Sequence, residues 1–400
     1  MSEMINGRSK LMVSAGKIRN FSMFAVLSGL LLTGMFLSTS THAQSFETAA
    51  KFAILVDQQT GRVLLEKQAD IAMAPASMSK LMTVLMLFER LEDGSLAMDD
   101  TFPVSEKAWR MGGSKMFVGV NTRVPIKDLL RGIIVQSGND ACIVVAEGLA
   151  SSETAFAEQM TTRGTEIGLQ NSTFGNATGW PHPEQRMSTR DLAKVAQQLI
   201  EKFPQYYPIF AEKAFTYNGI RQGNRNPLLY RYDGADGLKT GHTEESGYGL
   251  VSSAVRKGRR LILVVNGLTS VKQRSRESER LLDWGFREFG NYDLFRAGDK
   301  IVDAAVWLGT EGKVPLVIEN DMTLTLARKA RKKMKVSIEL IEPVPAPIKK
   351  GQEVGQIVIR APETDEIRVP LLAGSDVAQL GLFGRLGAAF GYLAWGAPSK

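Results

Sequence analysis

The stretch Ala76-Ser77-Met78-Ser79-Lys80 stands directly before an apolar run, and the rest of the chain is arranged around it. The run, residues 81–88, predicts a helix buried in the middle of a domain. Pro75 fits the start of that helix, which places Ser77 in its first turn. Because residues three apart share a helix face, the Lys80 amine can reach the Ser77 hydroxyl. This spacing predicts an activated serine nucleophile.

A second short motif, Ser137-Gly138-Asn139, follows an expected helix over residues 126–132. A Ser and a Lys three apart also occur by chance, so further motifs are needed to support the first pair. In the second motif a hydroxyl and a carboxamide two positions apart can point into one cleft. The hydroxyl could relay a proton while the carboxamide bonds a peptide group. Ser-Gly-Asn is also an ordinary turn sequence.

A third motif covers residues 236–243 and includes Lys239-Thr240-Gly241-His242. Strands are expected here and at 248–254 and 260–266. An edge strand that carries Lys, Thr and Gly can form the wall of an active site. We expect Lys239 and Thr240 to hold an anionic end group, and Gly241 to let a substrate backbone approach closely.

Composition excludes several classes of function. The 400 residues are 44% apolar and 23% charged, which is typical of a globular chain with two or more domains. The first 43 residues contribute +3 of the formal net charge of +7, so the remaining excess is mild and we expect no nucleic-acid partner. The basic run 328–335 is interpreted as a solvated turn or strand edge.

The cysteine and histidine content predicts neither a metal site nor a cofactor. Cys142 is the single cysteine and there are three histidines, which excludes an internal disulfide and a zinc site built on thiolates. Cys142 lies in an apolar run, where we expect a small buried side chain.

The N-terminal segment has the pattern of an export signal. A basic start is followed by an apolar segment over residues 21–37 and by small residues before Gln44. We predict a signal peptide over residues 1–43. The alternative is a retained N-terminal membrane anchor, for which the apolar segment is slightly short.

Residues 44–292 are predicted to form the catalytic domain. It begins with a hairpin of strands at 52–57 and 62–66, and ends with a helix over 274–289. Between these, a long loop over residues 171–186 separates helices at 152–169 and from 188 onward; loops of this length are usually functional or mobile. Asp191 either braces that loop or is an ordinary acid at a helix start.

The C-terminal part is predicted to contain a small β-sandwich domain and a membrane-binding segment. Residues 297–372 show short alternating runs and no catalytic set, which favours a spacer or a partner-binding module. Residues 374–400 are predicted to form an amphipathic segment that lies in a membrane interface. The alternative is a tail packed on the protein's own surface, and four glycines weaken the helix.

The ordered set Ser77-x-x-Lys80, Ser137-x-Asn139 and Lys239-Thr240-Gly241 resembles that of penicillin-binding proteins and class A β-lactamases. Residues 136–141 and 236–243 narrow the resemblance to the low-molecular-mass D-alanyl-D-alanine carboxypeptidases. It covers roughly residues 45 to 395. The resemblance implies an α/β (α+β) penicillin-binding/β-lactamase-like transpeptidase fold, with an antiparallel sheet flanked by helices and then a small all-β domain.

That resemblance also implies roles at the reacting bond. Ser77 would attack the carbonyl between two terminal D-alanines, and a neutral Lys80 would take its proton. Burial and the positive charge of Lys239 both favour the neutral form. Ser137 would relay protons to the leaving amine, and Asn139 would bond the substrate backbone.

The remaining roles concern charge on the substrate. The backbone N–H groups of Ser77 and His242 would form the oxyanion hole. Thr240, together with Arg225 of the segment 224–226, would bind the terminal carboxylate.

The implied function is a serine D,D-carboxypeptidase that trims pentapeptide stems of peptidoglycan and is acylated by β-lactam antibiotics. It would act on the periplasmic face of the bacterial inner membrane. A D,D-endopeptidase would share all the named residues, and a wall-binding or shape-organising protein with incidental catalysis is a third hypothesis. Residues 171–186 hold only Glu184 and lack the β-lactamase pattern, so β-lactam hydrolysis is expected to be slow.

Overall fold

The computed structural model describes residues 46–395, with side chains as far as residue 388. The chain divides into two compact units, Phe46–Phe289 and a second one from Gly290 onward. The predicted signal peptide lies outside the described residues. Within residues 46–395, no helix has the length and apolar character needed to cross a membrane.

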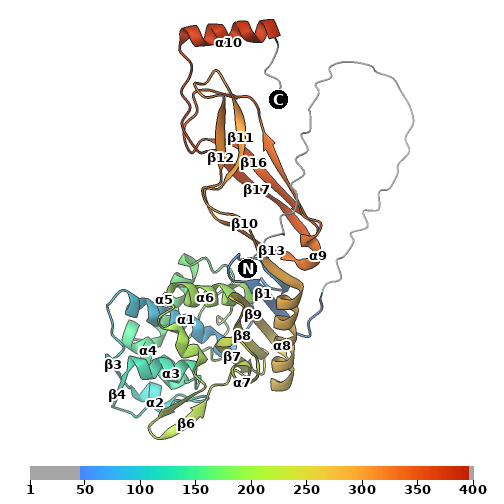
Figure 1. Ribbon diagram of the computed structural model, residues 1–400. Coiled ribbons are helices and arrows are strands. Elements are labelled where there is room, and N and C mark those ends of the chain that lie inside the picture. The colour runs from blue at the N-terminus through green and yellow to red at the C-terminus, as the bar shows by residue number, and fades with distance from the viewer. Residues whose placement is uncertain (1–45, 396–400) are drawn as a thin grey trace, which may run out of the picture. The chain divides into compact units, whose positions relative to one another are not determined.

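The first unit is built on a five-stranded antiparallel sheet with the strand order β2-β1-β9-β8-β7 (Figure 1). The strands are β1 (Phe52–Asp57), β2 (Val63–Lys67), β7 (Ala235–Thr243), β8 (Gly247–Arg256) and β9 (Arg259–Leu268). The hairpin of β1 and β2 confirms the prediction. Strand β7, which carries the third motif, lies at an edge of the sheet as predicted.

Helices cover both faces of this sheet (Figure 1). Helix α8 (Val271–Glu288) packs on one face, and α6 (Thr189–Lys202) packs on the other. Alternate side chains of β1 therefore enter different cores: Ile54 joins the α6 side and Leu55 joins the α8 side. The other helices are α1 (Lys80–Glu92), α2 (Glu106–Arg110), α3 (Ile126–Ile134), α4 (Asn139–Ala150), α5 (Glu153–Glu166) and α7 (Leu228–Arg231).

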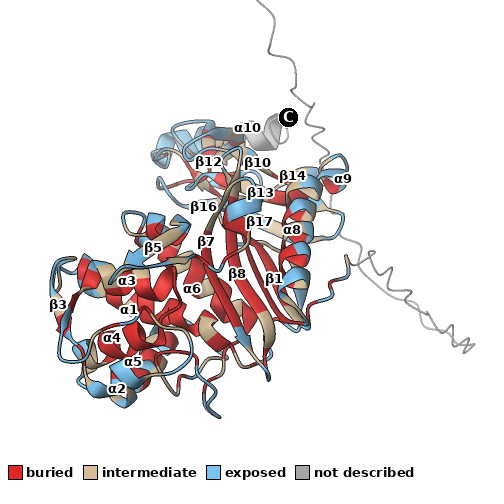
Figure 2. Ribbon diagram, turned by 90° about the horizontal axis from the view of Figure 1, so that it is seen from below, coloured by how far each residue is buried: buried red, intermediate tan, exposed pale blue. Residues whose placement is uncertain are grey.

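Helix α1 is the buried helix that the apolar run predicted, and Figure 2 shows it in the buried interior. Its start differs from the prediction. Residues Ala76–Ser79 form a separate 3₁₀ turn, η1, with Pro75 as its N-cap, and α1 itself begins at Lys80. Ser77 thus lies in a tighter turn than the first turn of an α-helix.

Several small elements escaped the sequence analysis. Strands β3 (Thr101–Pro103) and β4 (Arg123–Pro125) pair with each other. Strands β5 (Ala214–Tyr217) and β6 (Ile220–Gly223) form a hairpin after the 3₁₀ turn η2 (Tyr207–Ala211). All of them are short, with three to five residues each.

The second unit is all β in its core, which confirms the predicted fold class. One sheet has the order β14-β16-β17-β12-β11-β15, and β10 pairs with β13. The strands are β10 (Phe289–Phe295), β11 (Lys300–Trp307), β12 (Lys313–Val317), β13 (Met322–Ala327), β14 (Lys335–Leu340), β15 (Val344–Pro345), β16 (Glu353–Ala361) and β17 (Thr364–Ala373). Residues 290–292 lie within β10, and the basic run, interpreted as a solvated turn or strand edge, begins with a short helix, α9 (Arg328–Arg331).

The C-terminal helix α10 (Leu382–Trp395) starts later than the predicted amphipathic segment. Val377 is buried and bridges to Ile348, and Gln379 bridges to Gly309. These contacts hold residues 377–380 in the β domain, so only the residues from 382 onward form the helix.

Candidate active site

The buried amine of Lys80 is the centre of the site. Its Nζ lies 2.9 Å from Oγ of Ser77 and 2.7 Å from Oδ1 of Asn139, and it also donates to the carbonyl of Thr178. Burial lowers the pKa of Lys80 from 10.5 to about 8, and the positive charge of Arg225 acts in the same direction. The lysine is therefore poised to lose its proton near neutral pH.

Ser77 is presented by η1, where it is only half buried while its neighbours Met78 and Ser79 are buried. Oγ of Ser79 donates to the carbonyl of Ala76 at 3.0 Å and closes the turn. The turn packs against strand β7 at Gly241. A Cβ there would lie 2.8 Å from the carbonyl oxygen of Pro75.

The packing of η1 gives Gly241 a structural role in addition to the predicted one. The close approach of a substrate backbone at this glycine stays a prediction. In the structure, the group that approaches closely is η1 itself, through Pro75 and Met78. Gly241 therefore lets the nucleophile's turn lie against the edge strand.

Ser137 and Asn139 flank the sharp turn between α3 and α4. Ser137 is buried with a φ of +60°, and Asn139 is the first residue of α4. The adjacent carboxylate of Asp140 accepts N–H groups from Met116 and Phe117, each at 2.9 Å, and so ties this turn to its neighbouring loop. A non-glycine residue in the left-handed region is held there by its surroundings, as often at functional sites.

Lys239 reaches across from β7 to the second motif. Its Nζ lies 2.9 Å from Oγ of Ser137 and 3.2 Å from the carbonyl oxygen of Thr240. Burial lowers the pKa of Lys239 strongly, and the charge on Lys80 lowers it further. The repulsion between the two lysine charges is mutual, so it also favours the neutral form of Lys80, and the charge of Arg225 lowers the pKa of Lys80 as well.

The other predicted site residues lie around this pair. Thr240 is buried beside Lys239 on β7, and His242 is exposed near the end of the strand. The ring of His242 lies 4.0 Å from that of Tyr248 on β8. Arg225 is exposed and donates from Nη1 to Oγ of Ser114. The structure therefore brings all the predicted residues into one region.

Two groups were missed by the sequence analysis. Thr178 contributes only its backbone carbonyl, for which a sequence motif gives no signal. Arg274, near the start of α8, is buried, and its Nε has no hydrogen-bond partner in the described part of the chain. Its charge contributes to the lowered pKa of Lys239, which places it near the third motif.

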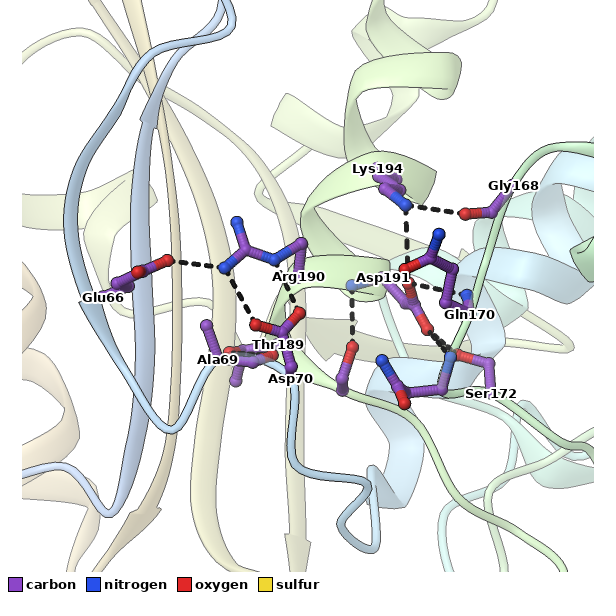
Figure 3. Close-up of polar contacts among 12 residues, drawn as sticks. Glu66, Ala69, Asp70, Gly168, Gln170, Ser172, Thr189, Arg190, Asp191 and Lys194 are labelled. Atoms are coloured by element: carbon purple, nitrogen blue, oxygen red, sulfur yellow. Dashed lines mark hydrogen bonds and ion pairs between the residues drawn. The ribbon is translucent and has the colours of Figure 1, made fainter. Parts of the chain in front are cut away.

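Residues 171–186, which we call the cleft loop, are held at their start by Asp191 (Figure 3). The carboxylate accepts from the backbone N–H of Gln170 at 3.2 Å, from that of Asn171 at 2.7 Å and from Oγ of Ser172 at 2.8 Å. Asp191 therefore braces the start of this loop, as one of the two interpretations predicted. Its neighbour Arg190 faces the opposite way and pairs with Asp70.

Comparison with protein families agrees with this arrangement. The sequence model of the family described as D-alanyl-D-alanine carboxypeptidase matches residues 38–270 of the chain. The chain belongs to the D-alanyl-D-alanine carboxypeptidase family. The model of the C-terminal domain of penicillin-binding protein 5 matches residues 289–379, which include most of the all-β unit.

Individual members of the carboxypeptidase family match over most of the chain. D-alanyl-D-alanine carboxypeptidase DacA of Escherichia coli is 36% identical over 345 residues, which are 84% of this chain and 86% of DacA. Penicillin-binding protein 5 of Haemophilus influenzae matches in structure with a TM-score of 0.75 and 35% identity, covering 83% of this chain and 98% of that one.

A third relative was solved with a β-lactam. Penicillin-binding protein D2 of Listeria monocytogenes, in its ampicillin-bound form, matches with a TM-score of 0.56 and 27% identity. The match covers 60% of this chain and 99% of that one. Membership of the carboxypeptidase family makes this chain a serine peptidase with the fold that the resemblance implied.

Proposed function

We propose that this enzyme removes the terminal D-alanine from peptidoglycan stem peptides through an acyl-enzyme on Ser77. The observation that carries the proposal is the 2.9 Å separation of Lys80 Nζ and Ser77 Oγ in a site where burial lowers the pKa of the lysine. A serine hydroxyl becomes a useful nucleophile when an adjacent base can take its proton.

The surroundings of Lys80 orient its lone pair. A neutral amine has two N–H donors, and Asn139 Oδ1 and the Thr178 carbonyl can accept both of them. The lone pair is then left for the hydroxyl of Ser77. As Oγ attacks the carbonyl between the two D-alanines, its proton passes to Lys80 and a tetrahedral oxyanion forms.

Ser137 completes the proton path to the leaving group. Its Oγ can accept an N–H from Lys239, and as its own proton passes to the departing amine it takes up the proton that Lys80 received from Ser77, so that Lys80 is neutral again. The C–N bond then breaks, D-alanine leaves and the acyl group remains on Ser77. A water molecule attacks the ester in the second step, with the proton path reversed.

Cationic groups are placed to receive the terminal carboxylate of the substrate. We assign the carboxylate to the hydroxyl of Thr240 and the guanidinium of Arg225, with Arg274 as a further positive charge nearby. Two buried lysines disfavour a double positive charge. A bound carboxylate near β7 would favour the charge on Lys239 and leave Lys80 as the neutral member.

The backbone N–H groups of Ser77 and His242 are proposed to bind the oxyanion. Strand β7 is an edge strand in the described sheet, so the N–H groups on its outer side have no strand partner. In a buried site, the hydrogen bonds from such preorganised donors become stronger as negative charge develops on the oxygen. Penicillins would acylate Ser77 through the same steps.

We also propose that the enzyme is exported and works at a membrane surface. The support is the sequence pattern of residues 1–43 and the exposed apolar side chains Leu382, Phe383 and Leu386 at the start of α10. Such a helix can lie in the headgroup region of a bilayer.

The test uses protein that lacks residues 1–43. D-Alanine release from diacetyl-Lys-D-Ala-D-Ala and labelling by a fluorescent penicillin are measured for the wild type and for Ser77→Ala. Release and labelling that both disappear in Ser77→Ala would support the proposal. Labelling without release would favour an endopeptidase or a wall-binding role, and labelling of Ser77→Ala would refute the assigned nucleophile.

A further inference from the structure

The cleft loop reaches the catalytic lysine through its backbone. The carbonyl of Thr178 accepts from Nζ of Lys80, and the preceding carbonyl, of Ala177, accepts from Oγ1 of Thr83 at 2.8 Å. Thr178 is buried. The position of a backbone carbonyl is set by the conformation of its turn, so the groups that fix this turn control one contact of Lys80.

The turn over residues 176–180 is organised around the side chain of Asn176. Its Oδ1 accepts from the backbone N–H groups of Thr178, Gly179 and Trp180, at 3.1, 2.8 and 3.1 Å. It also accepts from the hydroxyl of Thr178 at 2.9 Å, and Nδ2 donates to the carbonyl of Trp180 at 2.9 Å. One side chain thus bonds both backbone polar groups of Trp180 and the N–H of Thr178.

The same turn fits tightly against the nucleophile's turn η1. Gly179 has a φ of +77°, and a Cβ at this position would lie 2.0 Å from the carbonyl oxygen of Ala76 and 2.6 Å from Oγ of Ser79. The backbone can approach this closely only because residue 179 is a glycine. Asn176 on one side and this contact on the other define where the Thr178 carbonyl lies.

We propose that Asn176 is a positioning residue for acylation: by shaping the turn it holds the Thr178 carbonyl on Nζ of Lys80, which directs the lysine lone pair to Ser77. The inference rests on the proposed function and extends it. Asn176 acts through Thr178 and is not itself a catalytic residue.

Other anchors hold the backbone before Thr178, and one of them is Glu153, whose Oε1 accepts from the N–H of Ala177 at 3.3 Å. Oε1 of Gln185 accepts from the backbone N–H groups of Gly175 and Asn176, at 2.9 and 3.1 Å. Asp191 holds residues 170–172, as Figure 3 shows. Loss of the Asn176 side chain would therefore loosen the turn at Thr178 while the ends of the loop stay attached.

The titratable groups around Lys80 come from other elements, and one of them, the buried thiol of Cys142, is uncharged because burial raises its pKa. Asp140 and Cys142 lie on α4, Lys239 lies on β7, and Arg225 follows β6. The cleft loop contributes the uncharged carbonyl of Thr178 and covers the amine. A loosened turn would admit water to Lys80, and because burial is the main cause of its lowered pKa, that pKa would rise.

The experiment measures the second-order rate constant of acylation by a fluorescent penicillin as a function of pH. Asn176→Ala removes the side-chain bonds, and Asn176→Ser keeps a hydroxyl that can bond the same N–H groups more weakly. Asn171→Ala is the matched control: this asparagine lies in the same loop, and Asp191 binds its backbone N–H. Thermal unfolding is recorded for each protein.

Asn176→Ala is expected to lower the rate constant at neutral pH by about 10–100-fold, a typical effect of misplacing a catalytic group. On the acidic side of its pH–rate profile, the rate constant of Asn176→Ala is expected to fall at a higher pH than that of the wild type. Asn176→Ser is expected to recover part of the rate, and Asn171→Ala to match the wild type.

Identical pH profiles for Asn176→Ala and Asn171→Ala would overturn the inference, and so would a loss that serine does not recover at all. If Asn176→Ala does not fold, the profile of Asn176→Ser decides: a displaced acid limb supports the inference and an unchanged one overturns it. A wild-type protein that is not acylated would instead refute the proposed function.

Discussion

Nζ of Lys239 lies 2.9 Å from Oγ of Ser137, and both side chains are buried. The two residues belong to different parts of the unit, the edge strand β7 and the turn before α4. Their contact spans the site from the sheet to the helices. Removal of either partner therefore leaves a buried polar group without its bond.

Ser137→Ala is expected to slow D-alanine release by about 10²–10⁴-fold, the usual contribution of a positioned proton-transfer group. The substitution removes the hydroxyl that we place on the path to the leaving amine. Steady-state release from the diacetylated tripeptide measures the effect, and a fall in kcat with little change in KM is expected. An unchanged kcat would exclude Ser137 from proton transfer.

Acylation is expected to quicken as the pH rises through about 8, the lowered pKa of Lys80. A rising pH removes the proton from the lysine, and the neutral amine is the base; below this pKa the rate should fall about tenfold per pH unit. Stopped-flow acylation by a chromogenic penicillin gives the profile. A rate that is independent of pH from about 6 to about 9 would contradict a role for neutral Lys80.

Gly241→Ala is expected to impair acylation because its Cβ would meet the carbonyl oxygen of Pro75 at 2.8 Å and Cγ of Met78 at 3.0 Å. The turn that holds Ser77 must then shift. Overpacking of this kind costs about 1–3 kcal/mol of stability. Penicillin labelling and thermal unfolding test it.

Gly312→Ala is the control for that variant, since a Cβ at Gly312 has no heavy atom within 4 Å. It should leave labelling and the unfolding temperature unchanged. Equal behaviour of the two alanine variants would show that the close approach of η1 to Gly241 is unimportant.

Asp191→Ala is expected to reduce the free energy of unfolding by about 1–3 kcal/mol, because the buried carboxylate satisfies two backbone N–H groups and a hydroxyl at the start of the cleft loop. Asp70→Ala removes the exposed partner of Arg190 and should cost no more than about 1 kcal/mol. Urea unfolding compares the two. A larger loss for Asp70→Ala would contradict this account of the loop.

Deletion of residues 382–400 is expected to abolish sedimentation of the enzyme with phospholipid vesicles while D-alanine release continues. The deletion removes α10 with its exposed apolar residues Leu382, Phe383 and Leu386, and leaves residues 377–380 to close the β domain. If the shortened protein still bound to vesicles, another part of the protein would have to make the membrane contact.

The side chains of the site were predictable because each stands in a short motif with a chemical reason for its spacing. Ser77 and Lys80 are one helical turn apart, and Ser137 and Asn139 flank a tight turn. The presence of strands β7, β8 and β9 could also be predicted from their hydrophobic patterns and the turns between them.

What sequence reasoning missed depends on tertiary contacts. Thr178 acts through a carbonyl whose place is set by the fold of the cleft loop, and Arg274 is brought near β7 by the packing of α8. The packing of Gly241 against η1 is likewise a tertiary contact that no local pattern reveals. The sequence pattern predicted that Val377 belongs to an amphipathic tail. In the structure it pairs with Ile348, which keeps it in the β domain.

The position of β7 at the edge of the sheet also bears on self-association. An open edge invites pairing with another copy of the chain, and proteins discourage this by placing charged side chains on edge strands. Lys239 stands in the middle of β7, and the opposite edge, β2, ends in Glu66 and Lys67. Glu66 and Lys67 are exposed and so discourage pairing at β2, whereas Lys239 is buried against Ser137 and serves the active site instead.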